Sequence, residues 1–238
     1  MTSFIYSGSR SRFDSWRSRL SPKIVSFIEG LNSSNSVLDK GEVARLGLGT
    51  DRFFCFGSWD GHRTLWQQAQ LYCHARYLKP VQTDGGERVA YDSSDSLYDN
   101  KISPNKVKTV TNAKAGESYH NWGCAIDVYI CNRNGSIDWS LNYNRLYESL
   151  GLVQWGKDCG LEWGGSWADN GHFQDSVTLP TAEFWTESNA KRGYLFLGLG
   201  SSDSVPSAGG SDKKKWWIVG AVLAVVVIVA LTKKKFWG

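Results

Sequence analysis

An uncharged segment of 17 residues, 216–232, constrains the fold more than any other feature of this 238-residue chain. It reads W-W-I-V-G-A-V-L-A-V-V-V-I-V-A-L-T, and a lysine triplet brackets it on each side. As a helix it would extend about 25 Å, and interfacial lysines and tryptophans would close the gap to a hydrocarbon core of roughly 30 Å. A buried core helix is the alternative, but no domain follows for it to pack into. The segment therefore predicts a single membrane-spanning helix, and the equal flanking charges give no orientation.

A Gly- and Ser-rich stretch, residues 198–212, has the composition of a flexible tether. We therefore divide the chain into an N-terminal extension (1–21), a folded domain (22–195), a flexible linker (196–212) and a lysine-flanked membrane anchor (213–238). The first residues, M-T-S-F-I-Y-S-G-S-R, contain no apolar run of the length that a signal peptide requires. We expect the protein to be made in the cytoplasm and, at least at first, to stay there.

The composition is that of a folded body with a basic tail. The chain is 41% hydrophobic and 13% aromatic, which is enough for a packed core. Residues 213–238 hold six of the 27 basic side chains and none of the 23 acidic ones, so residues 1–212 carry 21 basic and 23 acidic groups, a net charge of −2. The net charge of +4 therefore belongs to the tail, and we predict no nucleic-acid partner.

The five cysteines are widely spaced and form no CxxC pair: Cys55, Cys73, Cys124, Cys131 and Cys159. An odd and sparse set differs from a secreted disulfide framework and is typical of small buried side chains in a reducing compartment. The sequence leaves open whether Cys131 pairs with Cys124 or with Cys159.

Short hydrophobic patterns alternate between helical and strand periods along the body. Helical spacing predicts helices over residues 22–31, 64–77 and 141–151, and short apolar runs predict strands over residues 53–56 and 124–130. The polar and turn-rich residues 83–108 predict a long loop. Because no regular strand–helix–strand repeat appears, we predict an α+β fold with a small antiparallel sheet flanked by helices.

Two of the four histidines lie in glycine-containing segments that also hold a carboxylate. Catalytic zinc takes three protein ligands and keeps one position open, and His120, Asp127 and His172 offer such a set. His120 and Asp127 can meet if the chain folds back at Gly123. Asp169, in a turn three residues before His172, would then be the general base that takes a proton from the attacking water and delivers it to the leaving amine. Alternatively, both histidines are ordinary side chains and Asp169 is a turn residue.

The zinc peptidases that cut cell-wall peptides have motifs that this chain resembles at residues 118–127 (S-Y-H-N-W-G-C-A-I-D), 160–167 (G-L-E-W-G-G-S-W) and 169–173 (D-N-G-H-F). This family comprises D-alanyl-D-alanine carboxypeptidases and the L-alanyl-D-glutamate endopeptidases found among phage lysis enzymes, and it shares its fold with the hedgehog signalling domain. Residues 61–72 look like the family's Arg-Thr segment, and residues 111–116 look like the lead-in to its first ligand. The resemblance implies that residues 22–195 form a zinc peptidase domain with a zinc cleft.

The resemblance also assigns roles to single residues. It implies that His120, Asp127 and His172 hold one zinc ion and that Asp169 is the base. Arg63 would lie beside the substrate, where its guanidinium polarises the scissile carbonyl or grips a carboxylate.

A structural salt bridge behind the site is the alternative role for Arg63. Ser118 would be a hydrogen-bond partner of the substrate or of a ligand.

Two features depart from the family pattern. Only Ala168 separates Trp167 from Asp169, so the rim near the base is shortened. The polar stretch 77–110 is longer than usual, as a lid or a partner-binding loop would be. Trp122 and Trp167 are close enough to the ligands in sequence to line the cleft, although most tryptophans in a small domain belong to its core.

We therefore predict a membrane-anchored zinc peptidase that hydrolyses peptidoglycan stem peptides, foremost at the L-alanyl-D-glutamate bond. Peptidoglycan lies outside the cytoplasmic membrane, whereas a body that precedes a terminal anchor and has no export signal stays in the cytoplasm. An anchor in the internal membrane of a membrane-containing bacteriophage particle resolves this conflict and predicts a virion-associated lytic enzyme. The alternatives are a bacterial membrane-bound D-alanyl-D-alanine carboxypeptidase and a non-catalytic structural or wall-binding virion membrane protein.

Overall fold

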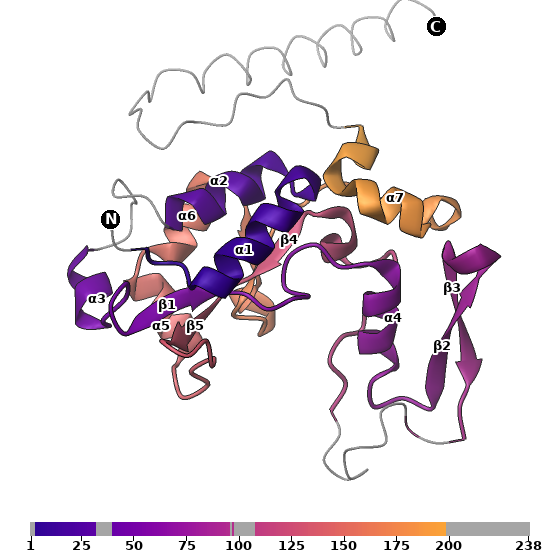
Figure 1. The fold of residues 1–238 in the computed structure, drawn as a ribbon, viewed down its shortest axis with the longest axis horizontal. Helices are drawn as coiled ribbons and strands as arrows, with labels where there is room; N and C mark the ends of the chain where they lie inside the picture. The colour runs from indigo at the N-terminus through magenta and orange to yellow at the C-terminus, as the bar shows by residue number, and fades with distance from the viewer. Residues whose placement is uncertain (1–2, 32–39, 96, 98–107, 199–238) are drawn as a thin grey trace, which may run out of the picture. The chain divides into compact units, whose positions relative to one another are not determined.

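Helices and short antiparallel strands make up the described chain, which comprises residues 3–31, 40–95, 97 and 108–198 of a computed structural model (Figure 1). The helices are α1 (Ser7–Trp16), α2 (Pro22–Leu31), α3 (Lys40–Arg45), α4 (Leu65–Cys73), α5 (Tyr143–Ser149), α6 (Leu152–Asp158) and α7 (Glu187–Arg192). The strands are β1 (Arg52–Cys55), β2 (Leu78–Thr83), β3 (Arg88–Ser93), β4 (Ala125–Asp127), β5 (Tyr129–Asn132), β6 (Glu162–Trp163) and β7 (His172–Gln174). Short 3₁₀ segments are η1 (Arg17–Arg19), η2 (Asp84–Gly86), η4 (Tyr119–Trp122), η5 (Gly164–Trp167), η6 (Ala182–Phe184) and η7 (Gly193–Leu197).

Three small antiparallel sheets replace the one sheet that we predicted, within the described residues. Their strand orders are β1–β5, β2–β3 and β4–β7–β6. The α+β class is confirmed. Sheets of this size need packing against other elements to be stable, and strand and helix residues share one core cluster.

Helix α2 forms the centre of the core and has the bounds predicted from its sequence. The Ser21 hydroxyl accepts a hydrogen bond from Ile24 N, which caps the helix start. Ile24, Phe27, Ile28 and Leu31, at helical spacing, are fully buried. Burying each of these side chains stabilises the fold by about 1.5–3 kcal/mol.

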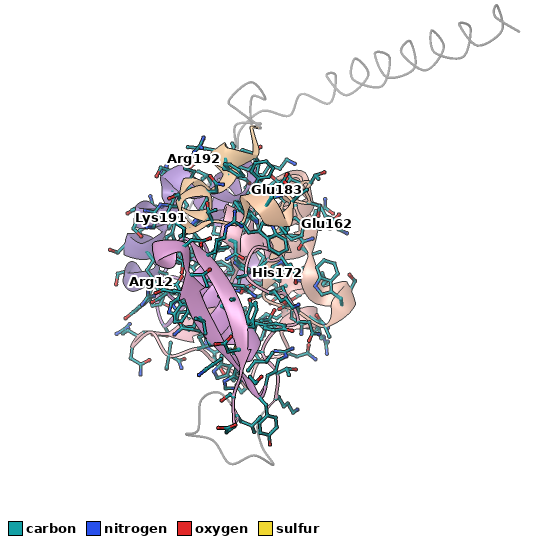
Figure 2. All side chains as sticks on the ribbon, turned by 90° about the vertical axis from the view of Figure 1, so that its right-hand side faces the viewer. Arg12, Glu162, His172, Glu183, Lys191 and Arg192 are labelled. Atoms are coloured by element: carbon teal, nitrogen blue, oxygen red, sulfur yellow. The ribbon has the colours of Figure 1, made fainter. Side chains whose placement is uncertain are left out.

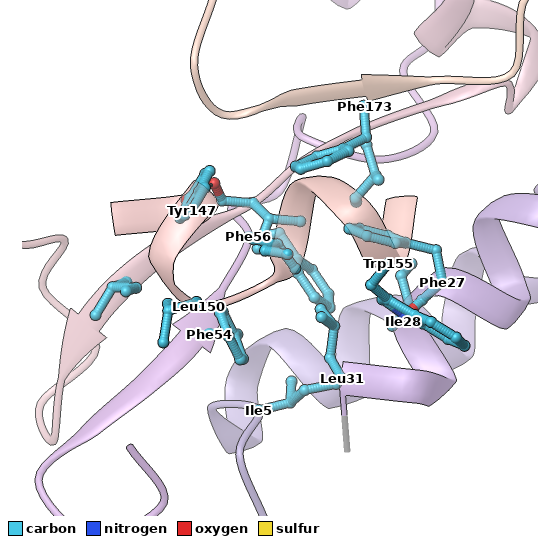
Figure 3. Packing of buried hydrophobic residues seen from close by; sticks show 14 of the residues in the cluster. Ile5, Phe27, Ile28, Leu31, Phe54, Phe56, Tyr147, Leu150, Trp155 and Phe173 are labelled. Carbon is cyan, nitrogen blue, oxygen red and sulfur yellow. Dashed lines mark hydrogen bonds between the residues drawn. The ribbon is translucent and has the colours of Figure 1, made fainter. Parts of the chain in front are cut away.

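The apolar face of α2 packs against α6 and β7 (Figure 3). Trp155 of α6 donates a hydrogen bond from Nε1 to Phe27 O at 3.0 Å, and an added Cβ at Gly30 would lie 2.0 Å from its ring. The Phe27 and Phe173 ring centroids are 4.6 Å apart. Because Phe173 is the middle residue of β7, this contact holds that strand in place.

Residues 3–21, which we set apart as an extension, are part of the same core. Ile5, Phe13, Trp16 and Leu20 are buried in one cluster with α2. Ser9 of α1 bonds through its hydroxyl to both the amide and the carbonyl of Phe56 at 3.0 Å. The domain boundary predicted at residue 22 is therefore too late.

The strand predicted over residues 124–130 is two strands in different sheets. Val128 separates β4 from β5, and its amide donates to Gly171 O at 2.8 Å. Ile126, Val128 and Ile130 all face the core, with no exposed surface. Because the apolar residues alternate without interruption from 126 to 130, the sequence pattern does not show that the chain passes from one sheet to another at Val128.

The predicted loop 83–108 contains structure that we did not expect. Residues 78–93 form the hairpin β2–β3, in which Leu78 pairs with Ser93 and Thr83 with Arg88. The turn is made by Gly85 and Gly86, whose φ angles are 66° and 96°. The hairpin packs against α4, as Figure 1 shows. Residues 98–107, also part of the predicted loop, lie outside the described residues.

The remaining helices differ from their predicted bounds. Residues 64–77 give the shorter α4, which Thr64 begins with a capping box to Gln67. Residues 141–151 give α5, which ends before Gly151. That glycine has a φ of 71° and begins α6, a helix that we did not predict. The strand predicted over residues 53–56 is β1.

All five cysteines are free thiols, so neither pairing of Cys131 is formed. Four are buried and Cys159 is half-buried, as expected of small apolar side chains. The predicted anchor (213–238) and nearly all of the predicted linker lie outside the described residues. Within the described part of the chain, no helix has the length and apolar character needed to cross a membrane.

Candidate active site

Three predicted ligands meet at the ends of three short elements. His120 lies in η4, Asp127 is the last residue of β4 and His172 is the first residue of β7. His120 Nε2 is 3.3 Å from both Asp127 Oδ1 and His172 Nδ1, and Asp127 Oδ1 is 2.8 Å from His172 Nδ1. The three ligand atoms therefore form a compact triangle.

The chain reverses at Gly123, as the sequence predicted. Gly123 ends η4 with a φ of 67°, and its carbonyl accepts a hydrogen bond from Ser21 N at 2.8 Å. A Cβ at this position would lie 1.9 Å from Arg19 O. Only glycine fits this turn, which brings His120 back over β4.

Hydrogen bonds to the far side of each imidazole fix which nitrogen faces the triangle. His120 Nδ1 lies 2.9 Å from the carbonyl of Gly61, which can only accept, so Nδ1 carries the proton and Nε2 is free. His172 Nε2 lies 3.1 Å from Gln174 Oε1. Gln174 Nε2 donates to Glu162 Oε2 at 3.2 Å, which points the amide oxygen at His172. His172 therefore offers Nδ1 to the triangle.

The carboxylate at the far end of this chain of contacts comes from the neighbouring strand. Glu162 of β6 is the cross-strand partner of Gln174 in β7. Figure 2 labels both Glu162 and His172. Sequence reasoning missed Gln174, although its place two residues after His172 on a strand puts both on one face.

The protonation states suit metal binding. Burial lowers the pKa of His120 to about 4, so this imidazole is neutral at neutral pH. Burial alone would raise the pKa of Asp127, but the adjacent histidines outweigh it and hold that pKa well below its usual range. Burial would lower the pKa of His172, but its hydrogen bond to Asp127 raises it overall. The triangle thus combines the charged carboxylate of Asp127 with the neutral imidazole of His120. His172 would lose its proton when a cation binds.

The geometry fits one zinc ion. Ligands about 2.0–2.1 Å from zinc at tetrahedral angles lie about 3.3 Å from each other. Two edges of the triangle have this length, and the third is shorter, as for a hydrogen-bonded pair. Among the described residues, His120, Asp127 and His172 form the group of potential ligands that could hold an ion.

Asp169 lies in a tight turn beside the triangle. Its amide donates to Gly164 O at 3.0 Å and its carbonyl accepts from His172 N at 3.1 Å. Ala168 precedes it with a φ of 64°, which closes the shortened rim in a strained conformation. Partial burial and then the charge of Asp127 raise the pKa of Asp169. A more basic carboxylate beside the ligands is suited to proton transfer.

Arg63 is buried and forms the salt bridge that we considered as its alternative role. Its Nη2 is 3.7 Å from Asp127 Oδ2, Nε donates to Trp59 O at 2.9 Å and Nη1 donates to Gln68 Oε1 at 2.8 Å. The residue is 7% exposed. Arg63 therefore supports the metal-side carboxylate, and its predicted contact with the substrate stays a prediction.

Ser118 and the two tryptophans take different places. Ser118 is buried before η4, where its carbonyl accepts from Asn121 N at 3.0 Å, and the role of its hydroxyl stays a prediction. Trp122 is fully buried and donates from Nε1 to Gly116 O at 2.8 Å, so it is scaffold. Trp167 is 51% exposed, with its ring centroid 6.5 Å from that of His172, and it lies at the rim of the site.

Comparison with known proteins agrees with this geometry. A family model described as D-alanyl-D-alanine carboxypeptidase matches residues 111–175, the segment that holds all three ligands and Asp169. This segment is therefore similar to the zinc peptidases that the sequence resembles. The chain is also 39% identical over 82 residues to the peptidoglycan L-alanyl-D-glutamate endopeptidase CwlK of Bacillus subtilis (strain 168). That alignment covers 33% of this chain and 48% of the relative, so the chain spans about half of the relative's length.

Proposed function

We propose that the protein is a zinc peptidase that hydrolyses peptidoglycan stem peptides at the L-alanyl-D-glutamate bond. The observation that carries the proposal is the triangle of His120, Asp127 and His172 with Asp169 beside it. The identity to an endopeptidase with this specificity supports the choice of bond.

In this mechanism, zinc supplies a Lewis acid that polarises the attacking water and the scissile carbonyl when it is bound. Asp169 takes the proton from that water and delivers it to the leaving amine, which completes the hydrolysis. Gly61 O and Gln174 keep the two imidazoles in the tautomers that leave His120 Nε2 and His172 Nδ1 free. Arg63 offsets the negative charge of Asp127.

The test is mass spectrometry of purified peptidoglycan after incubation with the full chain in detergent. We expect new termini at L-alanine and D-glutamate, abolished by a chelator and restored by zinc. Asp169→Asn should lower kcat about 10²–10⁴-fold while zinc content is retained. Asp158→Asn, which changes an exposed carboxylate on α6, is the matched control and should leave kcat unchanged. No product from the wild-type protein on any wall peptide would overturn the proposal in favour of a non-catalytic role.

A D-alanyl-D-alanine carboxypeptidase is the second candidate, because the matching family model carries that description. The same experiment separates the two activities. Loss of only the terminal D-alanine would identify the carboxypeptidase.

We further propose that residues 213–238 anchor the domain in the internal membrane of a bacteriophage particle. The uncharged residues 216–232 between lysine triplets support the anchor, and the motifs shared with phage lysis enzymes support the particle. The full chain should float with lipid vesicles, whereas a chain that ends at residue 205 should not. Detection in membranes of infected cells but never in purified particles would contradict the virion location.

A further inference from the structure

Tyr129 places a side chain at the candidate active site that the mechanism above does not use. It is the first residue of β5, two positions after Asp127. Because Val128 and Ile130 face the core, the extended chain directs Asp127 and Tyr129 to the other side. Its ring lies against Gly171, where an added Cβ would be 2.7 Å from Tyr129 Cε1 and 3.0 Å from its hydroxyl oxygen. Gly171 immediately precedes His172, so the phenol adjoins two ligands.

The Tyr129 hydroxyl has no protein partner among the described residues, and it reaches solvent. Among the described residues, the side-chain atoms that are buried and have no hydrogen-bond partner are Asn170 Oδ1, Asp175 Oδ2 and Glu187 Oε2. The Tyr129 hydroxyl oxygen is not one of these buried atoms. The neighbouring phenols differ, since Tyr143 bonds to the carbonyls of Ile130 and Asp138, and Tyr147 bonds to that of Val128. Tyr129 therefore keeps a free O–H donor at the site.

The Tyr129 phenol is available as a donor at neutral pH. A phenol is already neutral at pH 7 with its ordinary pKa near 10. Its O–H can therefore donate to negative charge that develops on a substrate oxygen.

We infer that Tyr129 contacts the substrate and donates a hydrogen bond to the carbonyl oxygen of the scissile bond as that oxygen gains negative charge. The inference rests on the proposed peptidase function. A donor of this kind acts mainly in the transition state, and removal of one typically costs about 10²–10³ in kcat where the donor is fully aligned. The partly exposed Tyr129 should contribute somewhat less, about 10–100-fold.

The test compares Tyr129→Phe with Tyr143→Phe in the full chain, using a synthetic stem peptide that the wild-type protein cleaves. Tyr143→Phe is the matched control because the Tyr143 ring lies edge-on to Tyr129, with centroids 5.8 Å apart, while its hydroxyl bonds only to backbone groups of Ile130 and Asp138. We expect Tyr129→Phe to lower kcat about 10–100-fold with KM within about twofold. Its zinc content and melting temperature should match the wild-type values, and Tyr143→Phe should keep kcat.

Each other outcome overturns a defined statement. An unchanged kcat for Tyr129→Phe, a raised KM at constant kcat, or loss of zinc or folding in that variant would overturn the role of Tyr129 alone. Absence of cleavage by the wild-type protein would overturn the proposed function together with this inference.

Discussion

Asp127 and His172 are direct cross-strand partners in the antiparallel pair β4–β7, and Asp127 Oδ1 lies 2.8 Å from His172 Nδ1. Two ligands that are 45 residues apart are thus set by the register of two three-residue strands. A slip of one residue between the strands would turn one of the two ligands to the opposite face of the sheet from the other. Metal affinity is therefore a sensitive measure of that register.

Gln174→Leu should weaken zinc binding about 10–100-fold, because His172 would lose the acceptor that fixes its tautomer. Competition with a chromophoric chelator measures the affinity. Gln154→Leu is the matched control, since Gln154 is exposed on α6 and bonds to Asp158 at 2.8 Å. Equal zinc affinities for the two variants would contradict the role of Gln174.

Gly123→Ala should destabilise the domain by about 2 kcal/mol more than Gly85→Ala does. Both glycines have left-handed φ angles, 67° and 66°, so both variants carry a backbone cost of about 1–2 kcal/mol. An added Cβ at Gly85 meets nothing within 4 Å, whereas at Gly123 it lies 1.9 Å from Arg19 O. Urea unfolding of both variants isolates the clash. Equal losses would show that the Arg19 backbone moves away freely.

Lys23→Met should destabilise the fold by about 2–3 kcal/mol. Lys23 Nζ is 2.7 Å from Asp175 Oδ1, and that carboxylate is 1% exposed, so the variant leaves it buried without its cation. Arg10→Met, which removes the exposed pair with Asp14, should cost under about 0.5 kcal/mol. If the two variants unfold at the same urea concentration, water reaches Asp175.

The stability of the domain should fall on the alkaline side of pH 9. Burial raises the pKa of the Cys73 thiol to about 11, while the thiol of an unfolded chain ionises near pH 8.5. The unfolded state then binds fewer protons, so the contribution is complete below about pH 8.5 and is lost as pH rises through 11, by up to about 3 kcal/mol. In urea unfolding between pH 8 and 10.5, the free energy of unfolding of Cys73→Ala should fall less steeply with pH than that of the wild-type protein. An identical slope would contradict the buried neutral thiol.

The sequence predicts local features of this fold better than it predicts pairings. The bounds of α2 follow from Ser21, Pro22 and the apolar spacing after them. The hairpin 78–93 is not predicted because its few apolar residues, such as Val89 and Tyr91, lie among polar residues, two glycines and Pro80, a composition typical of a loop. The division of 124–130 depends on Gly171 O, an acceptor from a distant segment.

The site divides in the same way. Residue types and spacing offer the three ligands and Asp169 only as one of two alternatives, and the resemblance to the zinc peptidases favours these roles. The support of His120 by Gly61 is not predictable from the sequence, because every residue has a backbone carbonyl. The burial of Arg63 depends on Trp59 and Gln68, whose positions only the tertiary fold defines.

Strand β7 alternates in its three residues between a core ring and two site side chains. Phe173 packs on Phe27, while His172 and Gln174 point to the opposite face of the strand, where Gln174 contacts the imidazole nitrogen that faces away from the candidate metal position. A cation held by His172 would therefore increase the free energy of unfolding of the whole domain by RT ln(1 + [L]/Kd). The melting temperature would rise with it. Conversely, Phe27→Ala, which removes the ring that packs on Phe173, should lower the affinity for zinc. Folding and metal binding would then be thermodynamically coupled, so that a change in one changes the other.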